Sequence, residues 1–105
     1  MAETRTFKGL TQDELELYEA KNHDYAGGGD PFGNFNRVAT IFALYPNLKL
    51  SDPRVVNLCY MMKQLDSAMW MLNEGYDGTV ENIDTRLRDV HVYAKICRLL
   101  EGKIC

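Results

Sequence analysis

The sequence lacks a hydrophobic run long enough to cross a membrane. A membrane-spanning helix needs roughly 18 or more consecutive apolar residues, and no stretch of this chain approaches that length. The first residues also lack the apolar segment of a secretory signal peptide. We therefore expect no membrane partner, and the expected location is the cytoplasm.

An excess of positive charge is also missing. The chain has 12 Lys and Arg against 15 Asp and Glu, a net charge of −3, and no basic block. Non-specific binding to duplex nucleic acid depends on clustered cations that neutralise phosphates, so we do not expect it here. A local group of lysines or arginines could still bind a small phosphate compound.

Cysteine and histidine are scarce. The three cysteines, Cys59, Cys97 and Cys105, form an odd set without CxxC spacing, and we predict that they are reduced. Cys59 and Cys97 fall on apolar faces of predicted helices, where cysteines are usually inert. Because His23 and His91 are the only histidines, a Cys–His hydrolase is not expected.

No segment alternates apolar and polar residues with the period of two that marks a half-buried strand. Helical spacing is present instead, and we predict an all-α, four-helix arrangement with helices at about 12–22, 31–45, 53–74 and 80–101. The last two are long and should form an antiparallel hairpin. Residues 1–10 are expected to be a flexible lead-in, and residues 11–105 a single α-helical domain.

Capping residues mark the predicted helix ends. Thr11 opens a capping box before the first helix. Asp30 and Asp52 each precede a proline that can occupy the first helical position. Thr79 is the expected cap of the last helix, and Gly102 is its expected stop.

The third predicted helix carries an apolar stripe with the spacing of a helix packed against other helices. Its members are Val55, Leu58, Met62, Leu65, Met69 and Leu72. The stripe is rich in methionine, and we expect a homo-oligomer, because two subunits could bury helix faces that one small domain leaves exposed.

One stretch, residues 21–35, combines glycine with hydrogen-bonding and aromatic side chains. The run Gly27-Gly28-Gly29 loses much entropy on ordering, but it offers unhindered backbone N–H groups. Because the run leads into a helix N-terminus at Asp30, an anion could bind there. A flexible connector between two helices is the alternative.

A polar row lies beside the apolar stripe. Cys59, Lys63, Asp66 and Trp70 are about 100° from it on the third helix. Arg86, Arg88 and Asp89 fall on the neighbouring helix. Lys63 and Asp66 are either a simple ion pair or part of a nucleotide pocket, in which the cation meets phosphate and aromatic rings stack on the base. Trp70 is equally explained as a core residue.

Carboxylates on facing helices could bind Mg²⁺, which prefers oxygen ligands. The candidates are Asp66, Asp84 and Asp89, with Asp24 as a fourth if the fold brings it near. Asp84 and Asp89 point about 140° apart around a helix, so they cannot both face one ion squarely. A set of solvated or salt-bridged acids is the interpretation that we favour.

Three motifs, taken together, resemble those of a known family. Residues 21–35 are similar to a K-x-x-D-Y-G … N-F signature, residues 61–66 to an M-x-x-K-x-x-R helix, and residues 87–94 to an L-x-D-x-x-x-Y-A helix. In this order they resemble small phage proteins of the nucleotide-modification-associated type. That group is distantly similar to the MazG-like, all-α nucleotide pyrophosphatases. The resemblance covers about residues 18–101.

The resemblance implies a helical bundle, often oligomeric, that handles a nucleotide or a nucleotide-derived phosphate compound in the host cytoplasm. The positions that match the family motifs are Lys21, Asp24, Tyr25, Asn34, Phe35, Lys63, Asp89 and Tyr93. The predicted ligand site also includes His23, Arg37, Asp66, Trp70 and Arg88.

The chain departs from the pyrophosphatase pattern in its carboxylates. Those enzymes share an E-E-x-x-E helix and a later acidic pair that holds Mg²⁺, whereas the third helix here offers only Asp66, and Thr85 stands where the related phage proteins often have an Asp. Our leading prediction is therefore a protein that binds or sequesters a nucleotide, cyclic or linear, without hydrolysing it. A Mg²⁺-dependent pyrophosphohydrolase and a helical protein-interaction module are the alternatives.

Overall fold

The protein is a set of four helices joined by short connections. The computed structural model describes residues 5–27 and 29–104, apart from the side chains of Tyr25 and Ile104. Its elements are α1 (Phe7–Ala26), α2 (Gly33–Ala43), α3 (Pro53–Glu74) and α4 (Ile83–Ile104). No strand occurs in these residues, so the all-α prediction is confirmed. None of the helices in the described part is both long and apolar enough to span a membrane.

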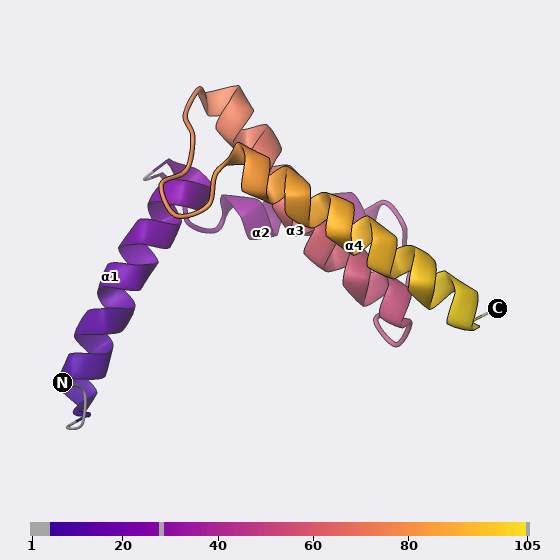
Figure 1. Ribbon diagram of the computed structural model, residues 1–105, viewed down its shortest axis with the longest axis horizontal. Helices are drawn as coiled ribbons and strands as arrows, with labels where there is room; N and C mark the ends of the chain where they lie inside the picture. The colour runs from indigo at the N-terminus through magenta and orange to yellow at the C-terminus, as the bar shows by residue number, and fades with distance from the viewer. Residues whose placement is uncertain (1–4, 28, 105) are drawn as a thin grey trace.

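Helices α3 and α4 lie side by side over most of their length and run in opposite directions (Figure 1), which confirms the predicted hairpin. Much of their contact is polar. In the first turns of α3, the side-chain amide of Asn57 donates to the carbonyl oxygen of Tyr93 at 2.8 Å. At the open end, Arg54 and Glu101 form an ion pair at 2.6 Å.

The predicted bounds of α3 are confirmed because its signals are local. The carboxylate of Asp52 accepts a hydrogen bond from the backbone N–H of Arg54 at 2.8 Å, and Pro53 takes the first helical position. Gly75 ends the helix in the left-handed conformation, with φ of 74°.

Helix α4 begins later than predicted, and Thr79 is not its cap. Asn82 and Thr85 cap the helix reciprocally, because each side-chain oxygen accepts the other residue's backbone N–H, at 2.9 and 3.0 Å. Thr79 instead donates to Asp24. Gly102 is not the stop either, since the helix continues to Ile104.

Helix α1 is longer than predicted at both ends. The hydroxyl of Thr6 accepts the backbone N–H of Gly9 at 3.0 Å and caps the helix, so residues 7–10 of the expected lead-in are helical. The predicted cap, Thr11, donates its hydroxyl to the carbonyl of Phe7. Residues 1–4 lie outside the described part.

Helix α2 is shorter than predicted. Asp30 accepts the N–H of Phe32 at 2.9 Å in a side-chain turn, and the helix begins two residues after Pro31, at Gly33. It ends at Ala43, two residues before the predicted end at Tyr45.

The chain is extended for its size. Its radius of gyration is 16.6 Å, whereas a compact chain of this length has a radius of about 13 Å. The N-terminal half of α1 projects away from the hairpin (Figure 1). Among the described residues, the buried apolar residues are Val55, Ala68 and Met71.

The apolar stripe predicted on α3 is only partly covered, which differs from a seam packed within one chain. Val55 is buried and Leu65 is half-buried, but Met69 and Leu72 are 59% and 65% exposed. The side of α3 that reaches α4 carries polar residues such as Asn57 and Gln64. The stripe therefore faces away from the chain's own hairpin partner.

Candidate functional site

A pocket of about 260 Å³ lies where α1, α2 and α3 meet. Four predicted ligand residues line it, one or two from each helix: Lys21, Asn34, Phe35 and Lys63. Tyr18, Asn22 and Pro31 complete the lining. Residues more than 40 positions apart in the sequence thus surround one small space.

Two residues of this lining, Tyr18 and Asn22, were missed in the sequence. They lie one turn apart on α1 and flank Lys21, so the three share one side of the helix. The side-chain oxygen of Asn22 is buried, and no donor among the described residues reaches it. Helical spacing around Lys21 is the signal that could have identified both.

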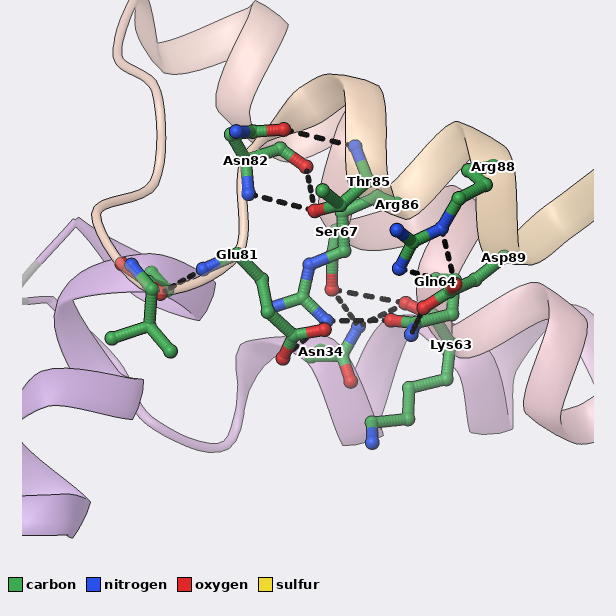
Figure 2. A network of polar contacts seen from close by, with 12 residues as sticks. Asn34, Lys63, Gln64, Ser67, Glu81, Asn82, Thr85, Arg86, Arg88 and Asp89 are labelled. Atoms are coloured by element: carbon green, nitrogen blue, oxygen red, sulfur yellow. Dashed lines mark hydrogen bonds and ion pairs between the residues drawn. The ribbon is translucent and has the colours of Figure 1, made fainter.

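Asn34 fixes α2 against α3 beneath the pocket. It is buried, and its amide group donates to the carboxylate of Asp66 at 2.8 Å and to the carbonyl of Lys63 at 3.2 Å. Figure 2 shows Asn34 beside Ser67 and Arg86, with the Lys63 side chain extending away from this network. Asn34 therefore positions the backbone that carries Lys63.

A second, larger pocket of about 460 Å³ shares Asn34, Phe35 and Lys63 with the first. The rest of its lining is almost entirely apolar or aromatic and comes from α2, from the connection to α3 and from the start of α3: Val38, Ala39, Phe42, Tyr45, Leu48, Leu50, Val55 and Cys59. In the combined site Lys21 lines the smaller pocket, Lys63 lines both pockets, and the larger pocket continues as an apolar groove.

Asp66, Arg37 and Trp70, which were predicted to contact ligand, contact one another. The guanidinium of Arg37 forms a two-pronged pair with the Asp66 carboxylate, at 2.8 and 2.9 Å. The same guanidinium lies 4.2 Å from the centre of the Trp70 ring. Gly33 leaves room for it, since a Cβ there would lie 2.9 Å from Arg37.

Asp24 is buried and joins α1 to the connection before α4. Its carboxylate accepts the backbone N–H groups of Thr79, Val80 and Glu81 at 2.7 to 2.8 Å, and the Thr79 hydroxyl at 3.0 Å. Burial raises the pKa of Asp24. The hydrogen bonds from Glu81, Thr79 and Val80 together lower the pKa by more than burial raises it, so the pKa lies below its ordinary value. The Tyr76 hydroxyl donates to the Asp24 carbonyl at 3.1 Å. The backbone N–H groups of residues 79–81 thus form an anion site that the Asp24 carboxylate occupies.

The glycine run ends α1. Gly27 is left-handed, with φ of 64°, and its N–H donates to the His23 carbonyl at 2.9 Å. The N–H of Gly29 donates to the Ala26 carbonyl. These two donors are used within the helix end, and Gly28 lies outside the described residues. His23 itself packs its ring 6.0 Å from that of Tyr76, and the side chain of Tyr25 is also outside what the structure describes.

Arg88, Asp89 and Tyr93 lie along the hairpin rather than in the lining of either pocket. Asp89 accepts from Gln64 at 2.8 Å and pairs with Arg88 at 3.2 Å (Figure 2). The Tyr93 ring meets that of Tyr60 edge-on, with centroids 5.9 Å apart.

Beside them, Arg86 is fully buried, donates to Gln64 at 2.5 Å and lies 3.4 Å from the Glu81 carboxylate. The sequence places it beside the polar row of α3, but it was not among the predicted ligand residues. The sequence shows a basic residue on a helix that packs against another helix. That signal does not distinguish a buried arginine from an exposed one.

The proposed metal ligands are not gathered into one site. Asp66 is engaged by Arg37, Asp89 by Gln64 and Arg88, and Asp84 is exposed. No group of three or more His, Cys, Asp or Glu side chains suited to a metal ion occurs in the described part of the chain.

The arrangement can bind an anion chemically joined to a flat or apolar group. Lys21 and Lys63 supply positive charge, and Tyr18 and Phe35 offer exposed aromatic surface beside them. No family model matches the chain, and no curated protein or solved structure is significantly similar to it.

Proposed function

We propose that this protein binds a nucleotide or a nucleotide-derived signal, cyclic or linear, and holds it without hydrolysis. The observation that supports this most directly is the pocket in which Lys21 and Lys63 lie beside Phe35. The lysines would neutralise phosphate oxygens, and the phenyl ring would stack on the base.

The buried oxygen of Asn22 would accept an N–H or O–H group from the ligand's base or sugar. A buried acceptor without a partner is costly, and Asn22 lies in the lining of the lysine-containing pocket. The adjoining apolar pocket leaves room for a base, or for a second one in a dinucleotide.

Hydrolysis with Mg²⁺ is the second candidate, and the resemblance to the MazG-like enzymes is its support. It requires carboxylates that converge on the phosphates, whereas Asp24 and Asp66 are engaged by groups of the chain itself. A helical protein-interaction module is the third candidate, supported by the exposed apolar residues of α3.

The proposal includes three further properties that rest on the resemblance and on the sequence. We propose that the protein is phage-encoded, that it acts in the host cytoplasm, and that it forms a homo-oligomer. A sequestering protein of this kind would act by stoichiometry rather than by turnover, so its binding must be tight.

Thermal unfolding with a panel of mononucleotides, dinucleotides and cyclic nucleotides tests the proposal. A ligand present at 100 times its dissociation constant should add about 2.7 kcal/mol of apparent stability. Lys21→Gln and Lys63→Gln should each weaken binding at least tenfold, because each removes a cation from the phosphate. Lys95→Gln, an exposed lysine on α4, is the matched control and should bind normally.

The outcome decides between binding without hydrolysis and hydrolysis. A panel without any stabilising nucleotide, or equal binding by all three lysine variants, would refute the proposed site. Release of phosphate or pyrophosphate in the presence of Mg²⁺ would establish the hydrolytic candidate instead.

A further inference from the structure

Helix α3 carries a continuous apolar face that the rest of the chain covers only in part. We define this open face by Leu58, Met62, Leu65, Met69 and Leu72, whose spacing of four, three, four and three residues is that of a helix–helix contact. Leu58, Met62 and Leu65 are half-buried, and Met69 and Leu72 are largely exposed. No charged residue interrupts the series.

The protomer also has more surface than its mass requires. Its accessible area is 7701 Å², whereas a folded monomer of 12.0 kDa has about 6,000 Å². The excess is about 1,700 Å², and a standard interface removes about 800 Å² from each partner. This excess, to which the projecting part of α1 also contributes, is enough for one standard interface.

We propose that the open face of α3 packs against the same face of a second copy, with the two α3 helices antiparallel. This inference gives the homo-oligomer proposed above a specific interface. In the antiparallel register, Leu58 meets the partner's Met69, and Met62 meets the partner's Leu65. Each central layer then pairs one leucine with one methionine, so the face is complementary to itself.

A second copy fits this face better than an unrelated protein does. A face without charge cannot select a partner by ion pairs, but a two-fold axis brings identical surfaces together and needs no charge complementarity. In this register every leucine–methionine pair on one side of the two-fold axis has an identical pair on the other side, as a symmetric contact between two copies requires.

Light scattering after size exclusion, without any nucleotide, tests the interface separately from ligand binding. The native protein should have a mass of about 24 kDa, or a multiple of it, against 12.0 kDa for one chain. Met69→Glu should give 12 kDa particles with an unchanged helical circular dichroism spectrum. Leu99→Glu changes a side chain on α4 that is 65% exposed, close to the 59% of Met69, and should leave the mass unchanged.

A double variant tests whether the two α3 helices are antiparallel. Leu58→Lys combined with Met69→Glu should restore the oligomer, because the antiparallel register places each lysine opposite the partner's glutamate. A parallel register would place like charges together, and the double variant would stay monomeric. A monomeric native protein, a Met69→Glu variant of unchanged mass, or dissociation by Leu99→Glu would each overturn the proposal.

Discussion

The carboxylate of Asp24, near the end of α1, lies 2.7 Å from the backbone nitrogen of Glu81, in the connection before α4. This bond joins segments 57 positions apart in the sequence, and Thr79 and Val80 donate to the same carboxylate. It holds α1 to the hairpin at the end of the helix that carries Lys21.

Replacing Asp24 with asparagine should destabilise the protein by about 3 kcal/mol. The asparagine amide keeps one acceptor oxygen, but an NH₂ group replaces the other oxygen and faces the backbone N–H donors. The charge is also lost, and hydrogen bonds to charged groups are worth about 1.5–3 kcal/mol. Urea unfolding followed by circular dichroism measures the loss. Asp13→Asn, at an exposed position of the same helix, should change stability by less than about 0.5 kcal/mol; an equal loss in both variants would contradict the anchoring role.

Asp24 also predicts how stability depends on pH. Its folded-state pKa is depressed, so its contribution is complete above the unfolded-state pKa, about 3.9, and is lost as pH falls through the lower folded-state pKa. The difference in unfolding free energy between the native protein and Asp24→Asn should therefore be constant from pH 7 to pH 5 and should shrink below about pH 4. A difference that grows on acidification would exclude this linkage.

Gly78 should tolerate no larger residue. A Cβ at this position would lie 1.6 Å from the carbonyl oxygen of Glu81 and 3.3 Å from the Asp24 carboxyl carbon, so Gly78→Ala must displace the backbone that binds Asp24. We expect a fall of about 2 kcal/mol or more in stability. The control is Gly102→Ala, where open space surrounds the new Cβ and the better helix former should add about 0.5–1 kcal/mol.

Arg37 should support the fold rather than the ligand. Arg37→Lys removes the two-pronged pair with Asp66 and the contact with the Trp70 ring, and lysine does not reproduce either geometry. Because Arg37 is partly exposed, we expect a loss of about 1–2 kcal/mol, together with a change in tryptophan fluorescence. Arg88→Lys, on the exposed side of α4, should alter neither; unchanged fluorescence in Arg37→Lys would contradict the assignment.

Local signals explain which parts of the fold could be predicted. The bounds of α3 follow from Asp52-Pro53 at one end and Gly75 at the other, all within the helix or next to it. The start of α4 could not be read in this way, because Thr79 has the chemistry of a cap but is bound by Asp24, 55 positions earlier. Thr79 donates its N–H and its hydroxyl to this distant carboxylate, whereas a cap residue would accept an N–H from the first turn of the helix.

The residues of the candidate site also separate into those that the sequence could predict and those that it could not. The motif positions Lys21, Asn34 and Lys63 do meet at one pocket, since each lies on a helix whose existence was predictable. Asp24 and Asp66 have the same residue type as ligand-binding acids, and only tertiary contacts show that they bind the chain's own donors. Sequence alone does not distinguish a carboxylate that meets a ligand from one that meets a loop.

The attachment of α1 near one end makes the helix a lever with its pivot at Asp24. Phe7 lies 17 residues from that pivot, about 25 Å along the helix axis, and its side chain is 88% exposed. A rotation of about 10° about the pivot would move Phe7 by about 4 Å but Lys21 by less than about 1 Å. In such a rotation the projecting end of α1 therefore moves several times farther than the part of the helix that carries Lys21.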